Sequence, residues 1–241
     1  MNVGEPVRAT IVVMPTRPIA IEGLPDLRDV GGRRTPGGRV RARALYRAGG
    51  LSGLVGPDAA DLARLGIRTV YDLRTADERA ERPGHVPRGA RWVAPDVLRD
   101  ASGLARTLCD PTAPEAVVEH AYRQLVALPS ALDAYKRLFH ELAQRAHRPA
   151  LLHCTTGADR TGWAVAALLL LLGVADEDVM ADYLLVPTPF VRREYLEAAI
   201  DEMQRRHRTI DVYFATGLGL GSAGVDELRA ALVLTRGAPA A

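Results

Sequence analysis

Hydrophobic residues along this 241-residue chain form short continuous runs that alternate with longer amphipathic stretches. The short runs predict buried strands at residues 44–47, 67–73, 90–93 and 150–153. A further strand is predicted at residues 11–13, in a segment interrupted by prolines. Helical periodicity and end signals predict helices at residues 57–65, 115–127, 131–145, 161–172, 177–184, 191–206 and 225–234. Strands separated by helices favour an α/β fold with a mainly parallel central sheet flanked by helices.

The longest apolar stretch runs from Trp163 to Val174 and contains five consecutive leucines. It is too short to cross a bilayer, which takes about 20 residues, so no membrane insertion is expected. A helix that is hydrophobic on all sides is typical of a protein core. We expect it to lie at the centre of the fold and to end at Gly173.

Composition and charge narrow the class of partner. The hydrophobic fraction is 48% and the charged fraction is 25%, as in ordinary globular proteins, and the length suits one domain with a large core. A net charge of +2 predicts no nucleic-acid partner and no membrane attraction. We expect most of the arginines to form a solvated surface. The histidines show no metal-ligand spacing, so neither a metal nor another cofactor is expected.

The two cysteines, Cys109 and Cys154, do not make a disulfide framework. The first residues lack the basic region and apolar run of a signal peptide, which predicts a cytoplasmic location, with export without a recognisable signal left open. We interpret Cys109 as an incidental thiol, with a protective disulfide to Cys154 as the less favoured alternative.

The most informative segment is His153 to Gly162, which places Cys154 and Arg160 at the two ends of a five-residue loop. A predicted strand precedes this loop and a predicted helix follows it. Inward-pointing backbone N–H groups and the positive end of the helix dipole together bind a doubly charged oxyanion. Such a field favours the thiolate form of Cys154, which is the nucleophilic form. The planar fork of Arg160 can hold two phosphate oxygens.

The remaining loop residues fit the same interpretation. Gly157 allows a tight turn, and the Thr161 hydroxyl can stabilise Cys154 as the leaving thiolate. An inert core cysteine is the alternative, and the combined spacing of cysteine, glycine and arginine makes it the weaker one. The predicted phosphate-binding residues are Thr155, Thr156, Gly157, Ala158, Asp159, Arg160 and Thr161.

The loop resembles the His-Cys-x5-Arg-Ser/Thr motif of the cysteine-dependent protein tyrosine phosphatase superfamily. With Asp-Arg-Thr-Gly at its end, the chain is similar to the bacterial tyrosine/serine protein phosphatases, the PtpB-like branch. Segments 27–32, 45–52, 65–74 and 181–184 are similar to further blocks of that branch, in the same order and spacing. The resemblance runs from about residue 24 to residue 196. It implies a protein-tyrosine-phosphatase-like domain at residues 21–241 after an extension at 1–20, and a phosphorylated substrate.

One position departs from the family pattern, because Ala158 stands where the family usually has lysine. That lysine suits multiply phosphorylated lipid head groups, so the resemblance does not extend to phosphoinositides. The leading prediction is a phosphatase of phosphotyrosine or phosphoserine/threonine in proteins. The alternatives are a phosphatase of a small phosphorylated metabolite, such as a sugar or nucleoside phosphate, and an inactive phosphate-binding module. A rhodanese-like sulfurtransferase is a weaker rival.

The proton for the leaving group has two candidate donors, Asp159 in the loop and Asp96 after the predicted strand at 90–93. An aspartate on such a loop can move over a bound phosphate. Asp96 could equally be a helix N-cap or a turn residue. The segment from residue 96 to residue 112 resembles a family lid, with an ordinary surface loop as the alternative.

Four more residues are weaker candidates for the substrate pocket. Arg28 and Asp29 match a family block that lines the pocket, and an ion pair that supports the Gly31-Gly32 turn is the alternative. Asp72 and Arg74 end a predicted strand on the pocket side, where Asp72 could also act as a cap or an ion-pair partner. We expect His153 to orient the loop through hydrogen bonds.

Overall fold

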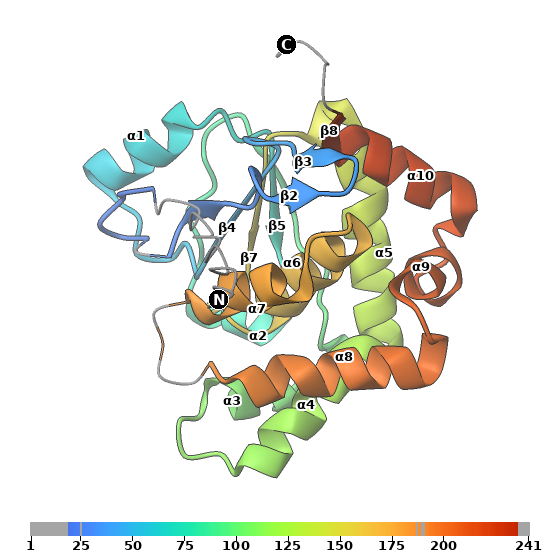
Figure 1. Cartoon of the computed structure of the whole chain (residues 1–241). Helices are drawn as coiled ribbons and strands as arrows, with labels where there is room; N and C mark the ends of the chain where they lie inside the picture. Colours follow the sequence, from blue (N-terminus) through green and yellow to red (C-terminus); the bar gives the residue numbers. More distant parts are fainter. Residues whose placement is uncertain (1–18, 25, 187, 189–190, 236–241) are drawn as a thin grey trace, which may run out of the picture.

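A five-stranded sheet forms the centre of the fold in the computed structural model, which describes residues 19–24, 26–186, 188 and 191–235 (Figure 1). The strand order is β1 (Arg28–Asp29), β4 (Leu45–Ala48), β7 (Ala150–His153), β5 (Thr69–Asp72) and β6 (Arg91–Val93). Strands β4, β7, β5 and β6 are parallel, and β1 is antiparallel to β4. The predicted α/β fold with a mainly parallel sheet is confirmed.

Successive side chains of each strand enter two different hydrophobic clusters, as the two-residue period of a strand requires. On β7, Leu151 joins the cluster that includes Leu62 of α1 (Gly56–Arg64), whereas Leu152 joins the larger cluster on the other face. The larger cluster includes residues of α4 (Glu115–Ala127), α5 (Pro129–Ala143), α6 (Arg160–Leu171) and α10 (Gly221–Leu232). The sheet is therefore covered on both faces, and β4, β5 and β7 are buried throughout, whereas Arg91 and Trp92 of the edge strand β6 are exposed.

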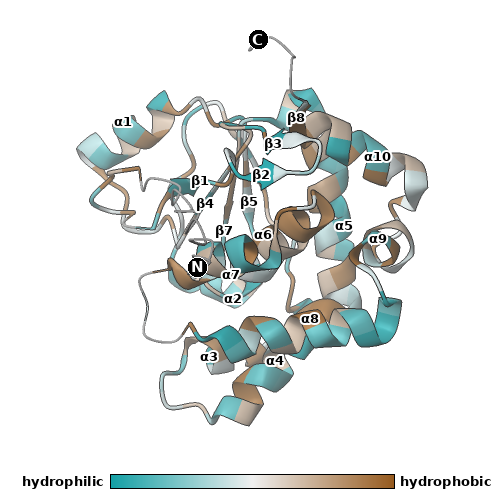
Figure 2. Ribbon diagram, viewed as in Figure 1, coloured by the Kyte–Doolittle hydropathy of each residue, from teal (hydrophilic) through white to brown (hydrophobic). Residues whose placement is uncertain are grey.

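Helix α6 is the buried central helix that the apolar run predicts. All of its residues except Leu170 are buried, and Figure 2 shows it largely in hydrophobic colours. Gly173, with a φ of +78°, ends the segment in the left-handed region. The other helices are α2 (Ala76–Glu81), α3 (Gly103–Cys109), α7 (Asp176–Leu184), α8 (Arg193–His207) and α9 (Ile210–Val212).

Several segments differ from the sequence-based predictions, which did not include β1, β2 (Arg34–Thr35), β3 (Gly38–Val40), α2 or α9. The helix predicted at 225–234 begins earlier, at Gly221, and ends at Leu232, because residues Val233–Thr235 form strand β8. Strand β8 pairs with β3, which pairs with β2, in a second, antiparallel sheet. This pairing joins distant parts of the chain, so local periodicity does not reveal it. The segment 96–112 contains helix α3 rather than loop alone.

The predicted strand at 11–13 lies outside the described residues. No described helix has the length and apolar character that a membrane crossing needs.

The parallel strands β4, β5 and β7 all end at one edge of the sheet, where residues 49–50, 73–74 and 154–159 follow them. Ligand sites of open α/β sheets lie at this carboxyl edge.

Candidate active site

The loop between β7 and α6 carries Cys154 at its start and is followed at once by Arg160, the first residue of α6. Cys154 is fully buried. Gly157 has a φ of +74°, and a Cβ atom there would lie 2.5 Å from Asp26 Oδ2 and 2.8 Å from the Ala48 carbonyl oxygen. Only glycine fits this position, both in backbone conformation and in space. The turn that curls the loop is therefore fixed by the sequence.

Two buried donors near Cys154 have no protein partner within the described part of the chain. They are Arg160 Nε and Thr161 Oγ1. A buried polar atom without a hydrogen bond costs about 1–3 kcal/mol, so such atoms point to a missing acceptor. A tetrahedral oxyanion seated in the loop would supply acceptors for both donors.

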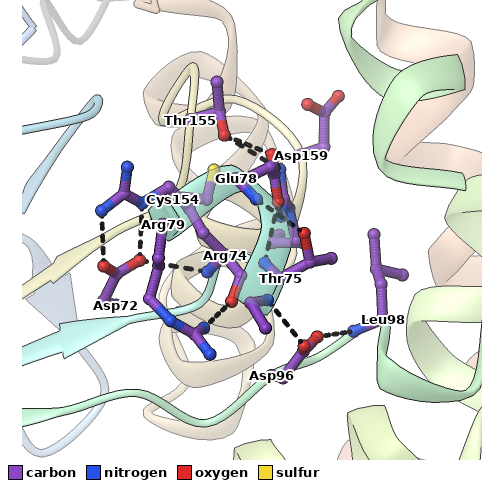
Figure 3. A network of polar contacts seen from close by, with 12 residues as sticks. Asp72, Arg74, Thr75, Glu78, Arg79, Asp96, Leu98, Cys154, Thr155 and Asp159 are labelled. Atoms are coloured by element: carbon purple, nitrogen blue, oxygen red, sulfur yellow. Dashed lines mark hydrogen bonds and ion pairs between the residues drawn. The ribbon is translucent and has the colours of Figure 1, made fainter. Parts of the chain in front are cut away.

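The other two nitrogens of Arg160 contact a residue that our sequence analysis did not single out, Glu78 of α2. Arg160 Nη1 donates to Glu78 Oε2 at 2.5 Å, and Nη2 donates to Oε1 at 2.8 Å. Thr155 Oγ1 also donates to Glu78 Oε1. Figure 3 shows Glu78 and Thr155 joined by these contacts close to Cys154. Glu78 thus holds the outer edge of the guanidinium while Nε stays available to a ligand.

The charge of Glu78 is set by this contact. Burial opposes its ionisation, but the hydrogen bonds and charge of Arg160 more than offset burial and lower the pKa of Glu78 to about 2. Glu78 also accepts from the Thr75 backbone N–H at 2.8 Å, while its own N–H donates to Thr75 Oγ1 at 3.2 Å. Thr75 and Glu78 form a capping box, Thr-x-x-Glu, at the start of α2. That motif is the sequence signal that could have located Glu78.

Asp159 lies in the loop with its carboxylate almost fully buried. Tyr122 of α4 donates its hydroxyl to Asp159 Oδ1 at 2.7 Å, and Thr156 Oγ1 donates to Oδ2 at 3.2 Å. Burial raises the pKa of Asp159 above its usual value, although the hydrogen bond from Tyr122 and the charge of Arg160 act against this. A raised pKa favours a carboxyl group that holds a proton near neutral pH, as a general acid requires.

Asp96 occupies a different environment. Its Oδ2 accepts from the Ala76 backbone N–H at 3.2 Å, and its Oδ1 accepts from the Leu98 backbone N–H at 3.1 Å. Figure 3 shows these bonds on the side of α2 away from Cys154. Both carboxylate oxygens therefore stabilise backbone groups at the start of α2 and in the following turn, which supports the turn-residue alternative for Asp96.

The sequence profile of the tyrosine phosphatase family matches residues 19–234, a range that includes the complete loop and its supporting helices. The chain belongs to the tyrosine phosphatase family. A candidate tyrosine-protein phosphatase of Cupriavidus necator is 31% identical over 181 residues, which cover 69% of this chain and 62% of the relative. The chain therefore spans about three fifths of that relative's length.

Two further proteins resemble the chain. The triple specificity protein phosphatase PtpB of Mycobacterium tuberculosis is 32% identical over 196 residues, covering 69% of each chain. A solved structure of P. aeruginosa TpbA, a variant in complex with phosphotyrosine, matches with 20% identity and a TM-score of 0.34, covering 80% of this chain and 95% of that one. The predicted resemblance to the PtpB-like bacterial phosphatases is confirmed.

Of the four weaker candidates for the substrate pocket of this tyrosine phosphatase, only Arg74 lines the pocket beside the loop. The other three are Arg28, Asp29 and Asp72. Arg74 is held by Asp72, with Nε to Oδ1 at 2.8 Å and Nη2 to Oδ2 at 2.7 Å. Asp29 accepts from the backbone N–H groups of Gly31 and Arg43, at 2.8 and 2.7 Å. Asp72 thus acts as an ion-pair partner, one of the alternatives for it. Asp29 supports the Gly31-Gly32 turn through backbone hydrogen bonds and not through the ion pair with Arg28 that the sequence suggested, because Arg28 pairs with Asp182.

His153 contacts the loop as expected. Its Nδ1 lies 3.1 Å from the Cys154 carbonyl oxygen, and its Nε2 lies 3.7 Å from Asp72 Oδ2. Burial lowers the pKa of His153, against the charge of Asp72. A neutral imidazole that donates to the loop backbone fits an orienting role.

A buried ion cluster behind the loop was not predicted as a unit. Asp182 of α7 accepts from Arg28, Arg33 and Arg47, at 3.3, 2.6 and 2.6 Å. Arg47 contacts Asp182 through Nη1, and its second terminal nitrogen, Nη2, donates to the Gly157 carbonyl oxygen at 2.7 Å. Because a trans peptide points its C=O and N–H in opposite directions, this contact orients the peptide after Gly157. Arg28, a pocket candidate in the sequence, belongs to this cluster instead.

A pocket of about 380 Å³ opens beside Thr155 and Glu78. Helix α3 forms part of its wall through Ala105, Arg106 and Cys109. Burial raises the pKa of the Cys109 thiol to about 11, which disfavours a reactive thiolate there. Among the described residues, no group of three or more His, Cys, Asp or Glu side chains could hold a metal ion.

Proposed function

We propose that this chain hydrolyses phosphate monoesters, with Cys154 as the nucleophile and phosphotyrosine or phosphoserine/threonine of proteins as substrates. The observation that carries the proposal is a pair of buried donors, Arg160 Nε and Thr161 Oγ1, that find no partner among the described residues and lie on the helix after the Cys154 loop. Together with the loop N–H groups and the amino end of α6, they suit a dianionic phosphoryl group. Family membership supports the same chemistry.

In the first step, the Cys154 thiolate attacks phosphorus, and an S–P bond forms as the bond from phosphorus to the ester oxygen breaks. The leaving oxygen takes a proton from Asp159. In the second step, water attacks the phosphoryl group and gives a proton to Asp159. The S–P bond then breaks, which restores the thiolate and releases inorganic phosphate. Arg160 stabilises the charge on the equatorial oxygens throughout.

We propose Asp159 rather than Asp96 as the acid. The burial and raised pKa of Asp159 suit a proton donor, and it lies in the loop itself. Asp96 would have to release two backbone N–H groups before it could act. A nucleophilic thiol, and a second free thiol at Cys109, suit a reducing compartment, which supports a cytoplasmic location.

The substrate class rests on the relatives, two of which are named as tyrosine-protein or triple specificity protein phosphatases. The pocket beside the loop is lined by the polar side chains of Arg74, Thr75 and Glu78. Gly50 and Ala105, which have no side chain or a small one, also line it. This open lining leaves room for a phosphorylated side chain presented on a peptide.

The proposal is tested with a panel of phosphotyrosine peptide, phosphoserine peptide, phosphoinositide and sugar phosphate, with Cys154→Ser as the control. We expect turnover of the peptides, inhibition by vanadate and no effect of EDTA. Full turnover by Cys154→Ser would refute the cysteinyl-phosphate route. Turnover limited to sugar phosphates would refute protein substrates and support the small-metabolite alternative.

A further inference from the structure

A second charged pocket lies at the opposite edge of the central sheet. It has a volume of about 410 Å³, and its walls are four arginines, Arg41, Arg43, Arg145 and Arg148, with Ala44, Pro149, Ala230 and Ala231 between them. Ala44 and Pro149 directly precede β4 and β7, whereas Cys154 follows β7. Pro149 and Cys154 are five residues apart along β7, which is roughly 17 Å at about 3.3 Å per residue, so the pocket and the loop lie at opposite ends of this strand.

The charged side chains that line the pocket are all basic. None of its lining residues in the described chain is acidic. Burial lowers the pKa of Arg148, and the nearby charges of Arg41 and Arg145 lower it further. The only carboxylate that contacts Arg43 is Asp29, which accepts from its backbone N–H and forms no ion pair with its guanidinium in the described structure. Four like charges are thus gathered in the lining, while the Asp29 carboxylate, whose ionised form the charge of Arg43 favours, lies outside that lining.

Two of the four arginines, Arg41 and Arg148, have a structural role because they bond carbonyl groups at helix C-termini. Arg148 Nη1 and Arg41 Nε donate to the Ala231 carbonyl oxygen, at 2.6 and 2.9 Å, and Arg148 Nη2 donates to the Ala143 carbonyl oxygen at 3.5 Å. These carbonyls lie at the C-termini of α10 and α5, which pack against each other (Figure 1). Cations are favoured at such ends. The contacts hold Arg41 and Arg148 in place at the pocket wall.

The other half of the pocket has no such structural role. The guanidinium groups of Arg43 and Arg145 are exposed and make no ion pair or side-chain hydrogen bond within the described residues. Arg148 Nε is buried and has no partner in the described chain. Two fixed and two free guanidinium groups around one cavity, with an unpartnered donor among them, indicate an anion that the protein itself does not supply.

We propose that this pocket binds an anion that carries at least two phosphate groups. Guanidinium forks match phosphate oxygens in pairs, and the two free forks of Arg43 and Arg145, with the unpartnered Arg148 Nε beside them in the described chain, offer donors for two phosphate groups. The small side chains of Ala44, Ala230 and Ala231 leave the cavity open between the charges. The ligand could be free in solution or displayed as a lipid head group, since both present the same chemistry. The site is independent of the proposed catalysis.

The test is calorimetric titration of the full chain with pyrophosphate, comparing wild type with the double variant Arg43→Gln/Arg145→Gln. Glutamine is polar and uncharged, so it removes the positive charge and the guanidinium fork without adding an apolar side chain. We expect the double variant to bind pyrophosphate at least tenfold more weakly than wild type, with a smaller dependence on salt. Phosphotyrosine turnover should stay unchanged, which separates this site from the loop. Arg123→Gln, on the exposed face of α4, should bind as wild type does.

A parallel assay uses sedimentation with vesicles that contain phosphatidylinositol bisphosphate. Sedimentation that the double variant loses supports the proposal with a lipid head group as the source, and pyrophosphate binding without sedimentation supports a free ligand. Equal pyrophosphate affinity and equal sedimentation in wild type and the double variant would overturn the proposal. Single substitution of Arg145 provides the same comparison if the double variant fails to fold.

Discussion

The ion pair between Glu78 and Arg160 predicts that Glu78→Gln weakens both the fold and the catalysis. Glutamine has nearly the shape of glutamate but lacks its charge. The variant would replace two charge-assisted hydrogen bonds, at 2.5 and 2.8 Å, with weaker neutral contacts. Arg160 would then be less firmly oriented toward the phosphoryl group. Glu78 acts through Arg160 and is therefore a positioning residue.

The magnitude follows from the pKa of Glu78. A fall from the ordinary 4.5 to about 2 corresponds to roughly 3 kcal/mol in favour of the ionised form in the folded state. Because the pKa is lowered on folding, this stabilisation is fully present above pH 4.5 and is lost as the pH falls toward 2. We expect Glu78→Gln to lose about 2–3 kcal/mol of unfolding free energy at pH 7, and the difference from wild type to narrow below pH 4.5.

Urea unfolding, followed by tryptophan fluorescence, measures the free energy of unfolding of each variant. Trp163 is fully buried, so its fluorescence reports the loss of the core. Glu81→Gln is the matched control, because Glu81 lies on the same helix, is exposed and makes no described ion pair. We also expect kcat to fall by roughly 10- to 100-fold in Glu78→Gln. If Glu78→Gln and Glu81→Gln unfold at the same urea concentration at pH 7, the reasoning about the Glu78–Arg160 pair is refuted.

Three further predictions concern the loop. Asp159→Asn should lower kcat by about 10²- to 10⁴-fold and remove the alkaline limb of the pH profile of kcat. Asp96→Asn should keep this alkaline limb, and the opposite pattern would assign the acid to Asp96. Tyr122→Phe removes a hydrogen bond that lowers the pKa of Asp159, so the limb should move to higher pH, and an unmoved limb would contradict the assignment. Gly157→Ala should abolish activity and cost about 1–3 kcal/mol of stability, whereas Gly53→Ala, where a Cβ meets nothing within 4 Å, should behave as wild type in both assays.

Features encoded by adjacent residues were predictable from the sequence. Strand β7 is a short apolar run, α6 is apolar on every side, and the loop between them carries its chemistry within ten residues. The alternation of strands and helices predicted the α/β fold, and the family resemblance supported it because segments far apart in the chain matched in order. Element ends were accurate to a few residues, and the error at β8 arose where a distant strand captured the end of a helical pattern.

Contacts between distant residues were not predictable in the same way. Glu78 lies 82 positions from Arg160, and Tyr122 lies 37 positions from Asp159. The sequence marked Asp182 only as part of a matching block, and its three arginines come from separate strands and loops. A carboxylate or hydroxyl in a helix is usually a surface residue, so its type alone did not point to the site.

The central claim is that the phosphoryl group passes through Cys154. The phosphorylated cysteine can be detected directly. The protein is mixed rapidly with a phosphotyrosine peptide, quenched into alkaline denaturant and digested, and mass spectrometry then locates the phosphoryl group. We predict a phosphoryl group on the peptide that contains Cys154, formed within one turnover and absent from Cys154→Ser. A phosphoryl group on any other residue, or steady turnover with Cys154 unmodified at every time point, would contradict the account.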